Sequence, residues 1–238
     1  MAAVIGGARF HNLITDYLLV HPSSFWSLRN LGREMSGYLD GHPLREEFPF
    51  LSDLARLEWA RIDVFDEADA DPLTREQITG VPQEAIPDLR LRLVPACRVL
   101  ALSWNVAPVW RRIEDLAESR ERCGINSASV DASEAPEAAP AVEIDSPERK
   151  PAFLRVWRRK FTVYHRSIRA DEHACLAEMD RAGESLPRIG EVILEDFPRD
   201  HGADEKSDPA AAAARRIAAL IEMWIEDGIV REIRGKPA

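Results

Sequence analysis

The side chains that could carry chemistry in this chain are its histidines, its cysteines and its carboxylates. Six histidines, at positions 11, 21, 42, 165, 173 and 201, form no HExxH or His-x-His pair. His165 and His173 could approach each other with Cys175 nearby, although unrelated surface positions are favoured. The cysteines, which also include Cys97 and Cys123, are odd in number and irregular in spacing. They fit neither a disulfide framework nor a CxxC site, and they favour a reducing compartment.

One carboxylate falls on the apolar face of a predicted helix. Glu58 lies one turn from Leu54 and Ile62. A buried carboxylate is costly unless it is paired. A catalytic acid is one interpretation, and an ion pair with an arginine such as Arg98 is the favoured one.

An acidic run follows the same helix and raises the question of a calcium site. It consists of Asp63, Asp66, Glu67, Asp69 and Asp71. The run has no central glycine, and an apolar leucine stands where a third ligand should be, so it departs from the calcium-loop pattern. A solvated helix end is the favoured interpretation. No phosphate loop, nucleophile elbow or metal motif appears elsewhere, and no cofactor is expected in this chain.

The most unusual stretch is basic and aromatic: FLRVWRRKFTVYHRSI, residues 153–168. The formal net charge of the protein is −10, yet this stretch contains no acidic residue. Its cations, with one just beyond it, are Arg155, Arg158, Arg159, Lys160, Arg166 and Arg169. Two apolar runs, 153–159 and 161–168, are close enough to pair as a hairpin. Such a ribbon suits nucleic acid, an acidic peptide or solubility alone.

The hairpin carries apolar side chains in both phases of its alternation. Phe153, Trp157 and Phe161 share one phase, whereas residues such as Val156 and Tyr164 share the other. We therefore expect one face to pack on helices and the other on something else. A solvated edge strand protected by cations remains an equal alternative to a docking edge. If the strand does dock a peptide, the residues predicted to bind are Phe161, Val163, Tyr164, His165, Arg166, Arg215 and Arg216.

Hydrophobic periodicity predicts an α+β protein that is mostly helical. Helical patterns cover 8–21, 23–41, 50–70, a short segment from Thr74, 108–121, 171–182, 185–197 and 208–227. Thr74 and Gln77 match a capping box, and the last helix is expected to begin with Asp208 as its N-cap and to stop at Gly228. The alternating run at 89–103 predicts strand, and a short strand is expected at 229–233. Three antiparallel strands, at about 97–103, 153–159 and 161–168, are expected to precede the last three helices. The stretch 124–151 is rich in Ala, Ser, Pro and Glu and is predicted to be a flexible insert. We expect an N-terminal helical domain at 1–88 and a second domain at 89–238.

Several of these segments together resemble the HvfC/BufC family. They are FPFLSDLARLEWARIDVFDEADADPL, LRLVPACRVL, FLRVWRRKFTVYHRSI and the tail ending in WIEDGIV. The resemblance extends from about Phe10 and implies that the chain starts within the family's N-terminal helical domain. It also implies a noncatalytic partner of a multinuclear non-haem iron oxidase that modifies cysteines of ribosomally made peptides. Proteins of this family have often been described as DNA-binding.

The second half is also similar to the winged-helix module that recognises leader peptides in the biosynthesis of ribosomal modified peptides (RiPPs). Such RiPP recognition elements take up the leader as an extra strand on a sheet edge. The resemblance therefore implies that this chain binds a precursor peptide and presents it to the oxidase, to which the metal chemistry belongs.

Two alternatives are a DNA-binding regulator with Arg215 and Arg216 near phosphates, and a purely structural oxidase subunit. The charge of −10 argues against nonspecific nucleic-acid binding. The sequence shows no signal peptide or membrane span, and a cytoplasmic protein is expected.

Overall fold

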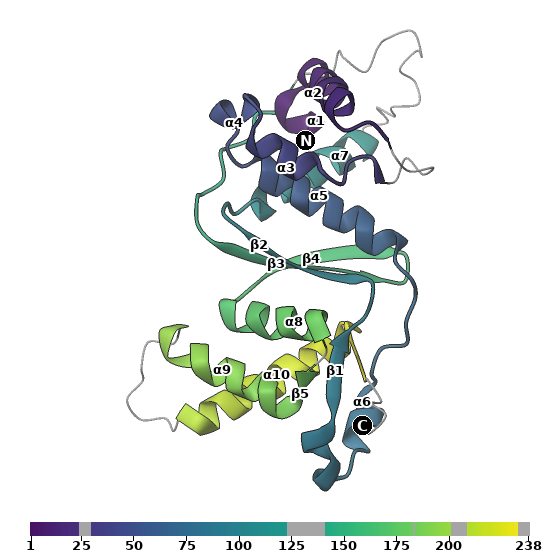
Figure 1. The fold of residues 1–238 in the computed structure, drawn as a ribbon, viewed down its shortest axis with the longest axis vertical. Helices are drawn as coiled ribbons and strands as arrows, with labels where there is room; N and C mark the ends of the chain where they lie inside the picture. The colour runs from purple at the N-terminus through teal and green to yellow at the C-terminus, as the bar shows by residue number, and fades with distance from the viewer. Residues whose placement is uncertain (24–29, 123–140, 183, 201–208, 233–238) are drawn as a thin grey trace. The chain divides into compact units, whose positions relative to one another are not determined.

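The computed structural model describes residues 1–23, 30–122, 141–182, 184–200 and 209–232. The protein is a mixed helix and sheet structure, 57% helical, with small antiparallel sheets (Figure 1). The predicted α+β, mostly helical class is confirmed at this level. The chain forms two compact units, each made of two segments. The first unit comprises Met1–Trp59 and Leu102–Ala152, and the second comprises Ala60–Ala101 and Phe153–Ala238.

The described part of the first unit is built from helices. These are α1 (Ala2–Ile5), α2 (Gly7–Val20), α3 (Met35–Asp40), α4 (Leu44–Glu47), the first half of α5 (Leu51–Asp66) and α7 (Ala107–Arg122). On α2 the predicted apolar stripe buries Leu13 and Tyr17, one turn apart. The Tyr17 hydroxyl donates a hydrogen bond of 2.6 Å to the carbonyl of Leu31. Asp53 on α5 accepts hydrogen bonds from the backbone N–H groups of Ser103 and Trp104, at 2.8 and 2.9 Å.

Two predicted segments of the first unit fall partly outside the described residues. The helix expected at 23–41 is described only from residue 30, and its helical part, α3, begins at Met35. The insert expected at 124–151 is described from residue 141. There it has no helix or strand, and two backbone hydrogen bonds hold it. The Val142 N–H donates to the Ala3 carbonyl at 2.8 Å, and the Asn105 N–H donates to the Glu148 carbonyl at 3.0 Å.

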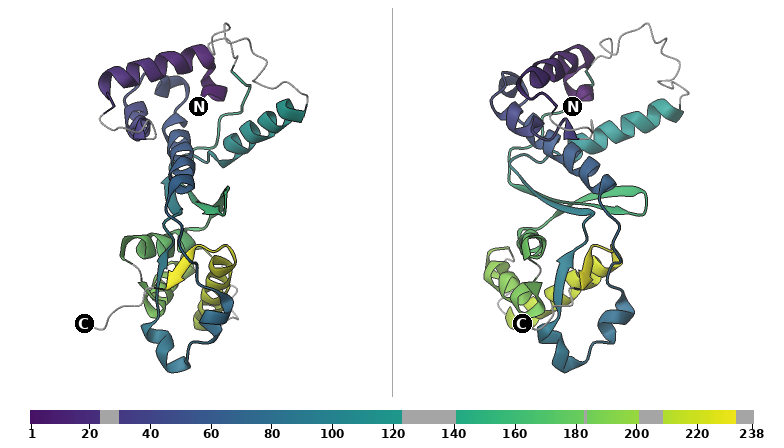
Figure 2. Two further views of the ribbon diagram at one scale, coloured as in Figure 1. Left: turned by 90° about the vertical axis from the view of Figure 1, so that its right-hand side faces the viewer. Right: turned by 45° about the vertical axis from the view of Figure 1, so that its right-hand side comes forward.

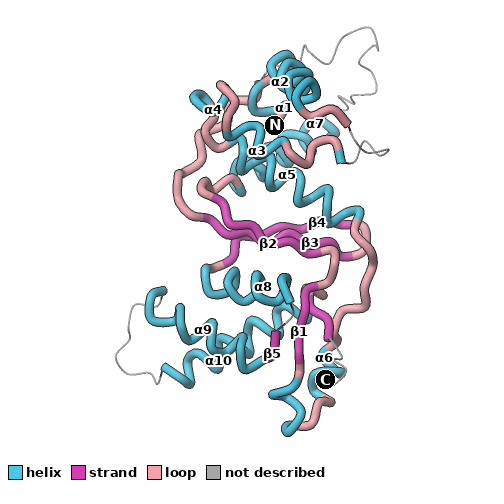
Figure 3. Tube along the Cα trace, in the orientation of Figure 1, coloured by secondary structure: helices cyan, strands magenta, loops and turns pink. Residues whose placement is uncertain are grey.

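The second unit contains two three-stranded sheets. In one, β1 (Arg90–Leu93) lies between β5 (Glu184–Ser185) and β6 (Val230–Glu232); in the other the order is β2 (Cys97–Leu102), β3 (Ala152–Arg159) and β4 (Thr162–Ile168). Its helical segments are the second half of α5, α6 (Arg75–Thr79), the 3-10 segment η2 (Gln83–Asp88), α8 (Ala170–Ala182), α9 (Leu186–Asp200) and α10 (Pro209–Glu226). Figure 3 distinguishes these strands from the helices, and α8 runs along one face of the β2–β3–β4 sheet.

The alternating run at 89–103 forms two strands, and the second of them, β2, confirms the strand expected at about 97–103. Leu89, Leu91 and Leu93 alternate as expected and are buried. After them the chain turns at Pro95, which has no N–H to continue the ladder. The Val94 N–H still bonds the Ile229 carbonyl at 2.9 Å, beside the end of β6, and β2 then joins the other sheet. Alternation cannot reveal that consecutive strands belong to different sheets.

The core of the second unit lies where its helices meet the sheets. Trp224, Leu176 and Met179 are fully buried within one hydrophobic cluster. The predicted capping box of α6 is present, because Thr74 and Gln77 exchange side-chain to backbone hydrogen bonds. The predicted stop of α10 is also present, since Gly228 has φ +69°. Its predicted N-cap, residue 208, lies outside the described residues.

Candidate functional site

The basic stretch forms a hairpin with a two-residue loop. Lys160 and Phe161 occupy the loop, and Arg159 pairs with Thr162 to close it. Lys160 has φ +55°. A positive φ is unfavourable for residues that have a Cβ atom, whereas glycine adopts it readily. Phe161 is 88% exposed. The loop and the residue pair that closes it, which we call the hairpin tip (residues 159–162), therefore present two cations and an aromatic ring to solvent. Figure 2 shows the backbone of the β3–β4 hairpin from two further sides.

The outer strand of this sheet is β4, and its hydrogen-bonding pattern follows from the register. Arg158 is opposite Val163, but the Arg158 N–H bonds the Ala96 carbonyl at 3.0 Å on the other side of β3. Arg158 and Val163 are thus a non-hydrogen-bonded pair, and such pairs alternate along an antiparallel ladder. Val163, His165 and Ser167 consequently direct their backbone N–H and C=O groups away from β3. We call this row the β4 edge.

One face of the hairpin packs on the core of the second unit. Trp157 belongs to the buried cluster, and its ring stacks on Tyr164 with centroids 5.5 Å apart. Further along β3, Phe153 packs on His173 of α8 at 4.4 Å. Burial lowers the pKa of His173, which favours the neutral ring. The prediction that one face packs on helices is confirmed. The expectation that Tyr164 shares a face with Val156 is wrong, because the two-residue loop places Tyr164 opposite Trp157.

The same face carries a buried ion cluster formed by Arg155, Arg166, Glu172 and Asp227. Arg155 is 0% exposed and binds both carboxylates, with Glu172 at 3.4 Å. Arg166 lies 3.6 Å from Glu172 and 4.0 Å from Asp227. The indole N–H of Trp224 donates to Glu172 at 3.2 Å. Two cations and two anions neutralise one another here, so these arginines add little net charge to the surface.

The opposite face of the hairpin contacts the second half of α5. The Arg158 guanidinium donates to the backbone carbonyls of Val64 and Glu67, at 3.0 and 2.7 Å, and it also lies 2.9 Å from Asp69. Arg158 therefore covers the carbonyls at the end of this helix, where a cation is favourable. The second face of the hairpin, which was expected to pack on something other than helices, therefore also packs on a helix.

The acidic run is the partner of these cations. Asp63 and Glu67 bind Arg98 of β2, with Asp63 at 2.7 Å, while Asp69 binds Arg158. The favoured interpretation as a solvated helix end is therefore wrong for Asp63 and Glu67, which are partly buried against Arg98, whereas Asp69 is 92% exposed although it binds Arg158. The expected partner of Glu58 was wrong too, because Glu58 pairs with the amino group of Met1.

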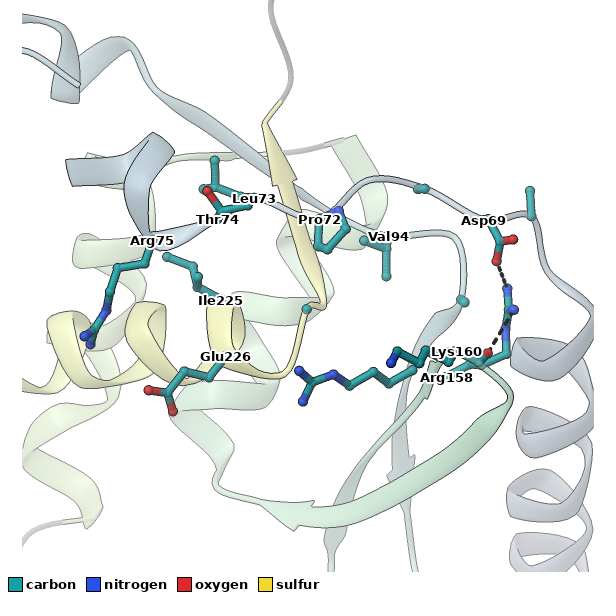
Figure 4. Close-up of a pocket in the computed structure, with 15 residues that line it drawn as sticks. Asp69, Pro72, Leu73, Thr74, Arg75, Val94, Arg158, Lys160, Ile225 and Glu226 are labelled. Carbon is teal, nitrogen blue, oxygen red and sulfur yellow. Dashed lines mark hydrogen bonds and ion pairs between the residues drawn. The ribbon is translucent and has the colours of Figure 1, made fainter. Parts of the chain in front are cut away.

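A cavity of about 580 Å³ lies beside the hairpin tip within the second unit (Figure 4). Figure 4 shows Lys160 and Glu226 well apart around it, with Pro72 and Val94 on a further side, above Lys160. Arg158 reaches its margin but is bound to Asp69. The cavity thus combines an apolar floor with separated charges, and its lining includes no histidine or cysteine.

The five predicted binding residues of β4 and its loop fall into different environments. Phe161 and Tyr164 are exposed, and Val163 is half-buried on the β4 edge. His165 is half-buried, and its Nδ1 lies 2.9 Å from a guanidinium nitrogen of Arg61. Arg166 belongs to the buried ion cluster but keeps 39% of its side chain exposed.

The two predicted residues of α10 differ from each other. Arg215 is exposed. The Arg216 guanidinium donates two hydrogen bonds, of 2.8 and 3.1 Å, to the carboxylate of Asp171 at the start of α8. Burial alone would raise the pKa of Asp171, but the hydrogen bonds from Arg216 and from the backbone N–H of Glu172 outweigh it and lower that pKa. The bond to Asp171 raises the pKa of Arg216. Arg216 therefore secures α10 to α8.

The thiols of the second unit are buried among apolar groups. Burial raises the pKa of Cys97 to about 12. Cys175 is also buried, and its Sγ lies 3.8 Å from the Ile189 carbonyl. Cys123 and His201 lie outside the described residues. A buried thiol with a raised pKa is a poor nucleophile and a poor metal ligand.

Two further kinds of feature, metal sites and membrane spans, are absent from the part of the chain that the structure describes. No group of three or more His, Cys, Asp or Glu side chains there is arranged to hold a metal ion. No described helix is both long and apolar enough to cross a bilayer. Among known proteins, neither a family model nor a curated protein matches the chain. The resemblance to the HvfC/BufC family therefore depends on the sequence segments quoted above.

Proposed function

We propose that this chain is a noncatalytic peptide-binding protein that takes up an extended precursor peptide as a fourth strand along the β4 edge. The observation that carries the proposal is the outward direction of the backbone groups of Val163 and Ser167. Within the described residues, the N–H groups of these two have no hydrogen-bond partner. Two outward N–H groups of this kind on one strand edge are a template for another strand.

The order of elements around the edge supports a winged-helix-like module of the RiPP-recognition-element type. A three-stranded sheet, β2–β3–β4, leads directly into α8, α9 and α10. Both faces of the β3–β4 hairpin pack on helices of the same unit, through Trp157 on one side and Arg158 on the other. A hairpin held from both faces is preorganised, and this lowers the entropic cost of binding a strand at its edge.

The proposed place of this protein is beside an iron-dependent peptide-modifying oxidase. That part of the proposal depends on the resemblance to the HvfC/BufC family, in which the partner supplies the metal and the chemistry. This chain would bind the precursor and present it.

The DNA-binding alternative is less well supported by the site. It requires both Arg215 and Arg216 to reach phosphates, and Arg216 is already engaged by Asp171. Breaking that pair would leave a buried carboxylate without its cation. The net charge of −10 also opposes approach to a polyanion.

The test of strand addition removes one backbone N–H group that points away from β3. Peptides that bind the wild-type chain would be selected from displayed random dodecapeptides, and their affinities measured by fluorescence polarisation. Val163→Pro removes an outward N–H, which the hairpin itself does not use, and places a ring on the docking side. We expect selected peptides to lose at least about tenfold in affinity, because a hydrogen bond and close strand contact are both lost.

Val163→Thr is the matched control. It keeps the N–H and the β-branched shape, so the selected peptides should bind it with nearly wild-type affinity. Circular dichroism would verify that both variants fold. Strand addition along β4 is wrong if the selection yields no binding peptide. It is also wrong if the selected peptides bind a folded Val163→Pro variant with wild-type affinity.

A further inference from the structure

The register of the β3–β4 hairpin determines which side chains a docked strand would meet. On the face that packs toward α8 and α10, β4 presents Tyr164 and Arg166, which lie opposite Trp157 and Arg155 of β3. Side chains directly opposite each other on neighbouring strands are in contact. A peptide strand beside β4 would therefore place two of its side chains, two positions apart, against Tyr164 and Arg166.

Tyr164 offers a contact for an aromatic or large apolar side chain. Its ring stacks on buried Trp157, and the residue remains 43% exposed. A third ring beside it would extend the stack across three strands and remove this apolar surface from water. Aromatic pairs of this type are among the most favourable cross-strand contacts.

Arg166 offers a contact for a carboxylate. Its distances to Glu172 and Asp227, 3.6 and 4.0 Å, are those of a loose ion pair. One of its Nη2 donors points to the sulfur of Met223, which is a weak acceptor. A guanidinium has five N–H donors, so Arg166 can bind an incoming carboxylate without leaving the buried ion cluster.

We propose that the β4 edge selects peptides in which an acidic residue precedes an aromatic residue by two positions. This inference rests on the strand-addition function proposed above and specifies its ligand. The order follows from direction: β4 pairs antiparallel with β3, and a strand continuing that pattern runs from Arg166 toward Tyr164. The residue between the two projects to the other face, beside His165, and does not take part in this selection.

The experiment compares three labelled peptides of a threonine-rich host. The first carries Glu and, two positions later, Phe; the second has Lys in place of Glu; the third has the same composition as the first but the reversed order. Fluorescence polarisation with the wild-type chain should show the first peptide binding at least about fivefold more tightly than either of the others. Equal binding of the first and the reversed peptide would overturn the proposal, and this arm needs no variant.

A second arm identifies the residue responsible. Arg166→Met keeps a long apolar side chain and removes the charge, so the preference for Glu over Lys should fall below about twofold while the benefit of Phe remains. Alkylation of Cys97, which is buried in the folded second unit, reports whether the variant is folded. An unchanged preference for Glu in folded Arg166→Met would also overturn the proposal.

The outcomes separate this inference from the function on which it rests. If the three peptides bind alike and all lose affinity in Val163→Pro, strand addition stands and the selection of an acidic–aromatic pair is wrong. If none of the three peptides binds, or if their affinity is the same for the wild type and Val163→Pro, strand addition and the selection of an acidic–aromatic pair are both wrong.

Discussion

The two ends of the β3–β4 hairpin contain the same types of residue in opposite environments. At the base, Arg155 is fully buried and binds Glu172 and Asp227. At the tip, Arg159 and Lys160 are exposed, and Phe161 projects into solvent. Charge along a sequence therefore does not equal charge on a surface. The basic ribbon is largely neutralised by carboxylates of its own chain, and its tip is its exposed cationic part.

This difference changes what an acidic protein gains from a basic hairpin. The cations at the base connect β3 and β4 to α8 and α10, and Arg158 connects β3 to the end of α5. Such contacts position the β4 edge, whereas the tip makes no comparable contribution to the fold. Substitutions at the base should therefore change the free energy of unfolding strongly, whereas substitutions at the tip should change it little.

The largest expected effect comes from the base. Arg155→Met should lower the free energy of unfolding by about 3–5 kcal/mol, because it leaves two carboxylates without their principal cation, one of them fully buried. Arg159→Met, four residues away in the same strand, should change it by less than about 0.5 kcal/mol because the side chain is exposed. Urea unfolding followed by circular dichroism and by alkylation of Cys97 would measure both.

Similar losses in the two variants would contradict the distinction between base and tip. A small loss in Arg155→Met alone would mean that Arg166 compensates for the missing charge. In that case the double variant with Arg166→Met should show a loss larger than the sum of the single losses.

A smaller effect with a clear dependence on pH is expected where β4 ends and α8 begins. Arg216 and the Glu172 N–H lower the pKa of Asp171 below its ordinary value. Asp171 should therefore stabilise the fold above the pKa of an unfolded aspartate, about 4. This contribution should be lost as pH falls from there through the pKa of the folded state. Asp171→Asn should cost about 1–2 kcal/mol at pH 7, and the difference from wild type should shrink below about pH 4.

The matched control is an exposed pair of the same kind in the first unit. Glu47 of α4 binds Arg9 at 2.8 Å, with both side chains about half exposed. Glu47→Gln should leave the urea midpoint unchanged at every pH, since exposed ion pairs contribute little. A constant gap between wild type and Asp171→Asn across the acid range would show that Asp171 acts through shape and not through charge.

Features with local causes could be predicted from the sequence. The hairpin, the capping box at Thr74 and the helix stop at Gly228 each depend on neighbouring residues, and the structure contains them. Alternation also indicated that both hairpin faces would be covered. These features depend on backbone geometry and side-chain spacing within a few residues of one another.

The pairing of charges could not be predicted in the same way. Asp69 and Arg158 are distant in sequence, and an acidic run beside a helix is usually solvated. Arg215 and Arg216 are adjacent and identical in type, yet one is exposed and the other binds Asp171. Which of two neighbouring arginines is engaged depends on the rotation of α10 against α8, and that rotation is set by tertiary packing.

The smallest expected effect is a gain in stability at the tip. Lys160 is the first of the two loop residues and has φ +55°, a position where hairpin loops prefer glycine. Lys160→Gly relieves the unfavourable backbone conformation, although glycine loses more entropy on folding. We expect a net gain of about 0.5–1 kcal/mol, because relief at a positive φ outweighs the entropy term.

The neighbouring loop position provides the control. Phe161 does not have a positive φ and is 88% exposed, so Phe161→Gly brings the entropic cost without the relief and without loss of buried surface. It should lower stability by about 0.5–1 kcal/mol. Thermal unfolding of the two variants should therefore move in opposite directions from wild type. If both lower the midpoint, the conformation of Lys160 is not a source of strain. The tip would then have no stabilising substitution, and its difference from the base would be one of exposure alone.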